Sequence, residues 1–338
     1  MFQNWPKLHS NKTDQSVLAR LREERRKRFR ILVCLDGSLE SLRGLKIAKE
    51  IKPSEYCDII LLYVRSIDQG LRTGGLEMKI ARENMLEWGL ELPGIGFLKE
   101  GLSRLVNDEE LTSTWQTHSS HTDSWGDPVG DNKVEYRHPD GRSIVLKLKT
   151  APDPASGILD QYELGPYNLI IMGAPKTWRS EFGAFFGAPV AQKVATLSPC
   201  SVLLSRTDKE GDEPNEKNHL ICISMSKHSI DAMQRDAVLA YNCGHSISLY
   251  TVINQKSELA DAERVLYQAR ENLSKIGVEI QDVDIGIGDP VTEIIKKGSS
   301  YYLISVAASS KKWYKRFFTT GVAFNVMAAS DKTVLNIR

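Results

Sequence analysis

The sequence lacks an excess of charge of either sign. Among 338 residues, Lys and Arg number 44 and Asp and Glu number 43, which gives a net charge of +1 at pH 7. A nucleic-acid coat or an acidic tail protein depends on a strong field of one sign, so this balance argues against both. No apolar run approaches the roughly 20 residues that a membrane helix needs, and no apolar signal segment opens the chain. We therefore expect a cytoplasmic protein that neither spans a membrane nor binds nucleic acid.

Paired cysteines and the common catalytic motifs are also missing. The five cysteines are dispersed without a Cys-x-x-Cys pair, as expected for reduced thiols. There is no Gly-x-Ser-x-Gly elbow, no phosphate loop ending in Gly-Lys-Ser/Thr, and no pair of catalytic carboxylates. The sequence therefore predicts a protein that is not an enzyme.

Two histidines, His118 and His121, have a spacing that could serve a metal ion. They lie in a polar segment that collects such residues by its composition alone. We therefore interpret them as part of a flexible surface loop and predict no metal.

Length and composition predict two globular domains. Hydrophobic residues make up 41% and charged residues 26% of the chain, as in an ordinary globular protein. At about 150 residues per domain, the chain is long enough for two domains that each bury a core.

Apolar runs alternate with helix-period segments. The run ILVCL ends at residue 35, the segment SLESLRGLKIAKEI follows, and DIILLYV occupies residues 58–64. Two such runs, joined by a helix and no hairpin turn, predict parallel strands with a crossover connection. The same alternation resumes at residues 144–150 and continues to residue 206. The pattern is typical of a doubly wound α/β sheet.

The alternation then repeats. A basic extension, residues 1–29, precedes a first domain over 30–206, and the polar linker 207–218 leads to a second domain over 219–338. The first domain carries an insertion at about 95–145. It ends in a predicted hairpin at its Pro-Asp-Gly turn, and it could form a lid or a docking surface.

Ligands of doubly wound folds bind at the carboxyl ends of the strands, where two residues stand out. Asp36 follows the first strand, and its carboxylate could accept hydrogen bonds from ribose hydroxyls or simply form a strand-to-helix turn. Gly173 follows the fourth strand of the first domain, where the missing side chain would let backbone N–H groups approach a phosphate.

Several segments in combination resemble the universal stress proteins. In the first half these are ILVCLDGS, LLYV, IIMGAP and SPCSVLLS, and in the second GDPVTEII, YYLISVAAS and KTVLNIR. The chain is thus similar to a tandem universal stress protein. The resemblance implies two Rossmann-like domains of the adenine nucleotide alpha hydrolase-like type, each with a five-stranded, mainly parallel sheet flanked by helices.

The resemblance also implies a site for an adenine nucleotide such as ATP in the first domain. Asp36 would hold the ribose, and the Val64 backbone would face the adenine. The residues that would line the phosphates are Gly173, Lys176, Gly187 and Ala188, and Met172 is a further residue of the binding site. Lys176 stands where nucleotide-binding members have a second Gly, and Ala188 where they have a hydroxyl.

The second domain departs further from that pattern. Ser224 replaces the acidic residue and Ala307 replaces the first Gly of the loop. We therefore expect this domain to be degenerate and to bind no nucleotide.

The resemblance implies a non-catalytic stress-response protein that binds a nucleotide and acts through a protein partner. Two alternatives remain open: an interaction module without any nucleotide, and a weak ATPase. Family members pair through their last strands, which correspond here to VLLS and VLNI. The two repeats should therefore form an intramolecular pseudo-dimer, and a homodimer of whole chains is a further hypothesis.

Overall fold

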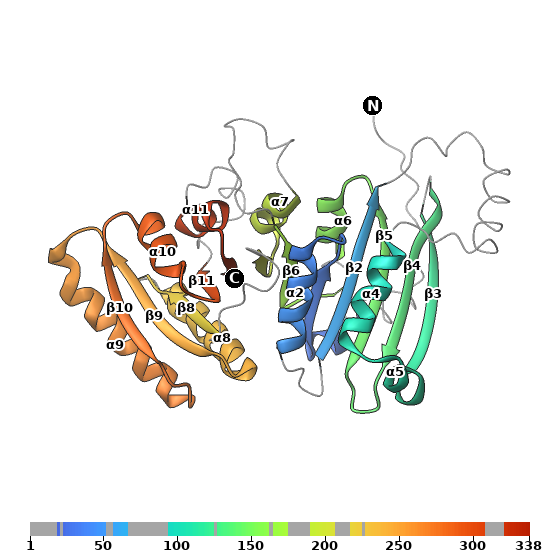
Figure 1. Ribbon diagram of the computed structural model, residues 1–338, viewed down its shortest axis with the longest axis horizontal. Coiled ribbons are helices and arrows are strands. Elements are labelled where there is room, and N and C mark those ends of the chain that lie inside the picture. The colour runs from blue at the N-terminus through green and yellow to red at the C-terminus, as the bar shows by residue number, and fades with distance from the viewer. Residues whose placement is uncertain are drawn as a thin grey trace.

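A computed structural model describes residues 19–20, 23–51, 57–66, 94–124, 127–161, 165–174, 190–206, 217–224, 227–307 and 321–338. The described strands form one twelve-stranded sheet in the order β10-β9-β8-β11-β12-β7-β6-β1-β2-β5-β4-β3 (Figure 1). The mixed α/β architecture expected from the sequence is confirmed.

The first half supplies seven strands. Five are parallel, in the order β7-β6-β1-β2-β5, and two antiparallel strands, β4 and β3, extend the sheet beyond β5. The elements are β1 (Phe29–Cys34), α2 (Leu39–Glu50), β2 (Cys57–Ser66), α4 (Ile95–Leu105), α5 (Asp108–Thr114), β3 (Gln116–Ser124), β4 (Asp127–Arg137), β5 (Ser143–Ala151), α6 (Pro154–Asp160), β6 (Leu169–Gly173), α7 (Val190–Leu197) and β7 (Ser201–Ser205).

The second half repeats the five parallel strands in the corresponding order, β10-β9-β8-β11-β12. Its elements are β8 (Asn218–Cys222), α8 (Lys227–Cys243), β9 (Ser246–Ile253), the 3-10 helix η4 (Lys256–Glu258), α9 (Leu259–Lys275), β10 (Asp282–Ile287), α10 (Pro290–Gly298), β11 (Leu303–Ala307), α11 (Val322–Ala329) and β12 (Thr333–Ile337).

The two halves join through their last strands, as expected. β7 and β12 pair antiparallel, with Val334 opposite Leu204 and Asn336 opposite Val202. An edge strand exposes unpaired N–H and C=O groups, and this pairing satisfies them within one chain. The two repeats thus fit an intramolecular pseudo-dimer.

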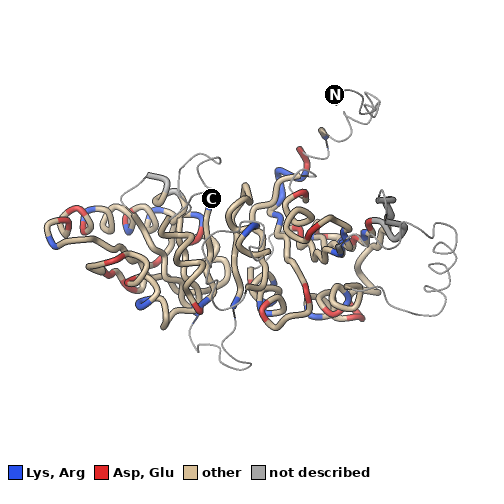
Figure 2. Tube along the Cα trace, turned by 90° about the horizontal axis from the view of Figure 1, so that it is seen from above, with Lys and Arg blue, Asp and Glu red and all other residues tan. Residues whose placement is uncertain are grey.

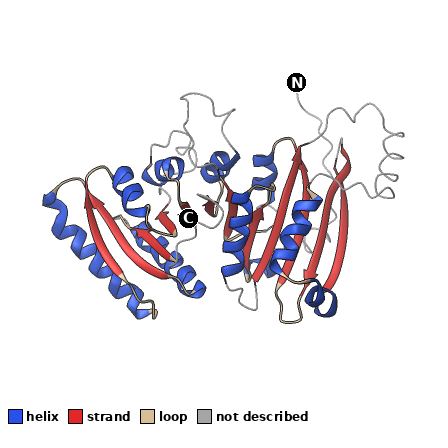
Figure 3. Ribbon diagram, in the orientation of Figure 1, coloured by secondary structure: helices blue, strands red, loops and turns tan. Residues whose placement is uncertain are grey.

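Helices cover both faces of the sheet (Figure 3). Helices α6, α7, α10 and α11 contribute to the core on one face, and α2, α4 and α8 contribute to the core on the other. Each of these two cores includes residues of both halves, so the joint between the halves is built like a domain interior. Burial of that apolar surface, at about 25 cal/mol per Å², is the main stabilising term.

Polar caps fix where several helices begin. Ser38 Oγ accepts a hydrogen bond from Ser41 N at 3.1 Å at the start of α2. Asp153 and Asp289 cap α6 and α10 in the same way, and each of these helices has Pro in its first turn. Such caps satisfy N–H groups that have no partner within the helix.

The insertion extends the sheet. β4 pairs with β5 through a hairpin at residues 138–142, in which His138 N donates to the Arg142 carbonyl at 2.9 Å. The hairpin expected at Pro-Asp-Gly is therefore confirmed. The surface loop expected at His118 and His121 is wrong, because both lie on the edge strand β3. A polar edge strand lacks the apolar alternation that reveals a strand in sequence.

Charged residues of both signs are interspersed along both halves (Figure 2). The basic segment before β1 includes an exposed helix over residues 23–26, with an ion pair between Arg20 and Glu24 at 3.5 Å. In the part of the chain that the structure describes, no helix is long and apolar enough to cross a bilayer.

Candidate functional site

Asp36 lies directly after β1, in the turn that leads into α2. Its Oδ1 accepts hydrogen bonds from Ser38 N at 3.0 Å and from Ser38 Oγ at 2.6 Å. Gly37 between them has φ +83°, a conformation that other residues rarely adopt. Asp36 is exposed, and within the described residues its Oδ2 makes no hydrogen bond. One carboxylate oxygen therefore builds the turn, and the other is available to a ligand.

Gly173, the last residue of β6, lies against the beginning of α2. A Cβ placed on it would stand 2.8 Å from the backbone atom Ser41 N, closer than a real Cβ comes, and 3.1 Å from Ser38 Oγ. The site therefore requires Gly for close packing of strand and helix. This close packing also brings Gly173 next to the Asp36 turn, as the sequence suggested. Both lie at the amino end of α2, where the helix dipole produces a partial positive charge.

Val64 lies beyond the end of the β1 ladder. The last paired residue of β1 is opposite Leu62, and Leu35 N donates to the Leu62 carbonyl at 2.8 Å. Backbone groups two residues apart on a strand point the same way, so those of Val64 point past the end of β1.

The remaining predicted residues contribute differently. Met172 is 5% exposed, and its side chain belongs to the core, so only its backbone can face a ligand. The last three predicted residues, Lys176, Gly187 and Ala188, lie outside the described residues.

The strand registers align the two halves residue by residue. Cys34 pairs with Met172 in the first half, and Cys222 pairs with Val306 in the second. Two residues beyond these cysteines stand Asp36 and Ser224. In the second half, Ser224 N donates to Ser229 Oγ at 2.8 Å, so a hydroxyl takes part in the turn and no carboxylate is present.

Two aromatic residues near Asp36 escaped the sequence analysis. Phe97 of α4 packs on Gly37, because a Cβ there would come within 2.4 Å of its ring. Its ring also meets that of Tyr63, with centroids 5.9 Å apart, and Phe97 is 38% exposed. The only signal in the sequence was the helix-period pattern of residues 95–105, which does not reveal which loop the helix meets.

The thiols at the ends of β1 and β8 do not supply a nucleophile. Burial raises the pKa of Cys34 and of Cys222 far above the ordinary value, and the charges of Asp36 and Asp236 act in the same direction. A raised pKa lowers the fraction of thiolate, the reactive form, and so disfavours a nucleophilic role for these thiols. The residues described contain no group of three or more side chains suited to a metal ion.

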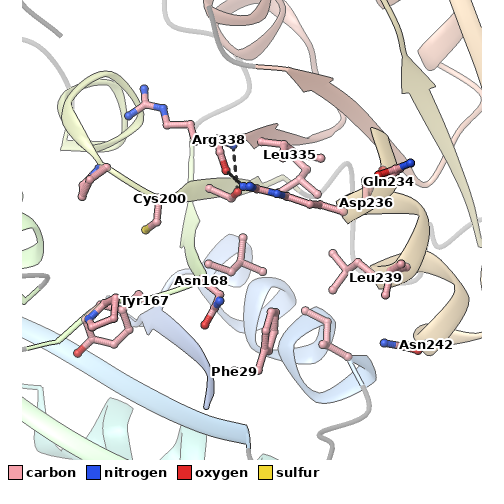
Figure 4. Close-up of a pocket in the computed structure, with 18 of the residues that line it drawn as sticks. Phe29, Tyr167, Asn168, Cys200, Gln234, Asp236, Leu239, Asn242, Leu335 and Arg338 are labelled. Atoms are coloured by element: carbon pink, nitrogen blue, oxygen red, sulfur yellow. Dashed lines mark hydrogen bonds between the residues drawn. The ribbon is translucent and has the colours of Figure 1, made fainter. Parts of the chain in front are cut away.

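A groove of about 1080 Å³ lies between the two halves (Figure 4). The first half contributes residues at the amino ends of β1, β6 and β7, and the second contributes α8 and the end of β12. Its labelled lining residues are Phe29, Tyr167, Asn168, Cys200, Gln234, Asp236, Leu239, Asn242, Leu335 and Arg338. Because Asp36 and Gly173 follow carboxyl ends of strands, this groove is separate from the predicted site.

Strand order and parallel crossover connections define a tandem doubly wound α/β protein. The chain is similar to the structure of a universal stress protein from Archaeoglobus fulgidus DSM 4304, with 18% identity and a TM-score of 0.55 over 91% of this chain and 96% of that one. A functionally unknown protein from Pseudomonas aeruginosa PAO1 is 13% identical with a TM-score of 0.54 over 95% and 94%. No protein-family model and no curated protein matches the sequence. The chain has the fold of a two-domain universal stress protein.

Proposed function

We propose that the first half binds an adenine nucleotide at the carboxyl ends of β1, β2 and β6, and that the chain is a non-catalytic binding protein. The observation that carries this proposal is that Asp36 and Gly173 both lie against Ser38 at the beginning of α2. Asp36 offers an exposed carboxylate oxygen there, and Gly173 offers backbone groups that no side chain of its own shields.

Each part of a nucleotide has a counterpart. The Oδ2 atom of Asp36 accepts hydrogen bonds from ribose hydroxyls, and the backbone of Val64 pairs with the edge of the adenine. Phosphate oxygens lie near Gly173, where nothing but backbone limits their approach. Lys176, Gly187 and Ala188 complete the phosphate side, as the family resemblance implies, and Lys176 supplies a positive charge.

The equivalent positions of the second half support restriction to the first. Ser224 carries no negative charge, and Ala307 adds a Cβ where Gly173 has none. We propose that the second half leaves its site empty and serves as the permanent partner of the first.

The test compares two matched substitutions in the full chain. Asp36→Ala should weaken ADP or ATP binding, measured by calorimetry, by about 10- to 100-fold, as expected for lost hydrogen bonds to a charged group. Ser224→Ala, at the equivalent turn, should leave the affinity unchanged. Absence of binding at millimolar nucleotide, or an equal loss in both variants, would refute the proposal.

A second candidate function is an interaction module that binds no nucleotide. The observation that favours it is Phe97, whose ring covers Gly37 beside Asp36. This candidate predicts no nucleotide in the purified protein by absorbance and mass spectrometry, and no gain of binding in Phe97→Ala. A weak ATPase would instead release phosphate in a metal-dependent reaction that Asp36→Ala abolishes.

A further inference from the structure

The groove between the halves has a counterpart on the other side of the joint. In the first half, Asn168 N, directly before β6, donates a hydrogen bond to the Arg30 carbonyl of β1 at 2.9 Å. In the second half, Tyr302 N, directly before β11, donates to the Asn218 carbonyl of β8 at 3.1 Å. The strand registers match these two bonds, so Asn168 in the groove and Tyr302 in the counterpart occupy equivalent places.

A side chain of the protein itself fills the counterpart. Tyr302 is only 3% exposed, and its hydroxyl donates to Glu50 Oε2 of α2 at 3.1 Å. Glu50 also pairs with Lys217, whose Nζ lies 5.5 Å from the centre of the Tyr302 ring. An aromatic ring, held by a carboxylate and an ammonium group, therefore occupies this place.

The groove has other residues at these three positions. The smaller Asn168 stands at the place of the tyrosine. Phe29 stands at the place of the lysine, because each precedes the residue whose carbonyl accepts the bond described above. Val238 of α8 stands at the place of the glutamate, because it follows the end of β8 at the same distance along the chain as Glu50 follows the end of β1. The ring and both charges are thus replaced by uncharged side chains, and the space is open.

Apolar side chains of the groove are left exposed to solvent. Val238 is 44% exposed, and Ile276, directly after α9, is 49% exposed. Phe29 of β1 and Leu239 of α8 lie on opposite sides of the groove (Figure 4). A molecule placed between them removes apolar surface from water, which favours binding.

Charged residues of the wall are held by contacts within the protein. The exposed Arg235 donates through Nη1 to the Arg338 carbonyl, and Arg338 Nη2 donates to the Ala195 carbonyl at 2.6 Å. Asp236 Oδ1 lies 3.2 Å from His219 Nδ1, and its Oδ2, without a hydrogen-bond partner in the described residues, is closed to solvent. The surface that the groove offers is therefore mainly uncharged, with Arg235 as an exposed cation at its wall.

We infer that the groove binds a small uncharged aromatic molecule, whose ring takes the place that Tyr302 fills in the counterpart. Phe29 packs against this ring, and Val238 covers its edge. The exposed Asn168 accepts from Arg30 N through Oδ1 at 2.8 Å, so its Nδ2 amino group points the choice towards a ligand with a hydrogen-bond acceptor. A volume of about 1080 Å³ is enough for a molecule of this kind.

The experiment titrates the full chain with two probes that share one ring system. The neutral probe 2-naphthol should bind once per chain with a Kd of about 0.1–1 mM, measured by calorimetry. The anionic probe naphthalene-2-sulfonate should bind at least about tenfold more weakly, because its charge loses hydration among apolar side chains. Absence of saturable 2-naphthol binding would overturn the inference, and tighter binding of the sulfonate would overturn the choice of an uncharged ligand.

Three variants locate the bound probe. Asn168→Tyr puts into the groove the ring that closes the counterpart, and should weaken 2-naphthol binding by at least about tenfold. Val238→Glu places a charge on an exposed position of the wall and should weaken binding similarly without a change in the urea midpoint. Tyr267→Ala removes a 64% exposed ring elsewhere and should leave binding unchanged. An unchanged affinity in Val238→Glu, or an equal loss in Tyr267→Ala, would overturn the assignment to the groove.

Two further measurements separate this site from other occupants. An excess of ADP should leave 2-naphthol binding unchanged, because the groove lies at the amino ends of the strands; competition would assign the probe to the proposed nucleotide site instead. Sedimentation should give the mass of one chain with and without the probe. A dimer that 2-naphthol dissociates would make the groove an interface between two copies and would overturn the inference.

Discussion

Leu203 of β7 lies directly opposite Leu335 of β12, at the point where the two halves of the chain become one sheet. Their side chains are 0% and 2% exposed, and both belong to the core that also contains residues of α2 and α8. The joint between the halves therefore resembles a domain interior more than a contact between separate domains.

From this shared core we expect that truncating one of its side chains lowers the free energy of unfolding strongly. Leu335→Ala should lower the free energy of unfolding by about 2–5 kcal/mol, because it removes buried methyl groups and leaves a cavity. Urea unfolding measures the change. Val283→Ala on the edge strand β10, where the side chain is 36% exposed, is the control and should cost much less. Similar losses in the two variants would contradict the shared core.

A polar contact also links the halves. Tyr302 Oη donates to Glu50 Oε2 at 3.1 Å, and Glu50 also pairs with Lys217. In a double-mutant cycle, Glu50→Gln and Tyr302→Phe should show an interaction energy of about 1 kcal/mol in urea unfolding. Additive effects of the two substitutions would mean that the contact contributes nothing.

His245 predicts a pH dependence of stability. Burial, and then the neighbouring His219, lower the pKa of His245 from 6.5 to about 4, while Glu50 acts in the opposite direction. Between these two values the unfolded chain binds a proton that the folded protein does not. The contribution of His245 to the free energy of unfolding should therefore be fully present above pH 6.5. It should fall by about 2 kcal/mol, after allowance for solvent screening, as the pH is lowered towards 4.

Variants test this assignment. His245→Gln should flatten the dependence of urea midpoints between pH 6.5 and 4, whereas His118→Gln on the exposed strand β3 should keep the parental slope. A slope that His245→Gln leaves intact would assign the effect to another group.

A buried ion pair anchors the basic segment to the sheet. Asp58 of β2 accepts hydrogen bonds from Arg28 Nε at 2.7 Å, Arg30 Nε at 3.3 Å and Ser143 Oγ at 2.6 Å. Asp58→Ala should lower the free energy of unfolding by about 3–5 kcal/mol, because it leaves the buried Arg30 without its carboxylate. Thermal unfolding measures the loss, and the exposed Asp261→Ala serves as the control, with little expected change.

The sequence predicted the repeated elements well because most of their strands are buried on both faces, the edge strand β10 being the exception. The runs around Leu32, Ile170 and Ile304 are apolar throughout, and all three residues are at most 1% exposed. The polar strand β3 was missed for the opposite reason. Its residues pair through the backbone at the sheet edge, and a backbone ladder leaves no mark on the side-chain pattern.

The candidate site was predictable only in part. Asp36 and Gly173 could be chosen from sequence because each follows an apolar run. Phe97 could not, because its helix begins far along the chain and meets Gly37 only through folding. The distances that define the site depend on the packing of α2 and α4 on the sheet.

The sequence by itself determined the succession of strands and helices, their duplication and the strands that would pair at the joint. Local periodicity encodes the succession and the duplication, whereas the pairing of the last strands was implied by the family resemblance and covers the apolar edges of β7 and β12. Only the tertiary structure decided that Glu50 would pair with Lys217 and accept a hydrogen bond from Tyr302. Such contacts join residues distant in the chain, and their charges act through space rather than along the sequence.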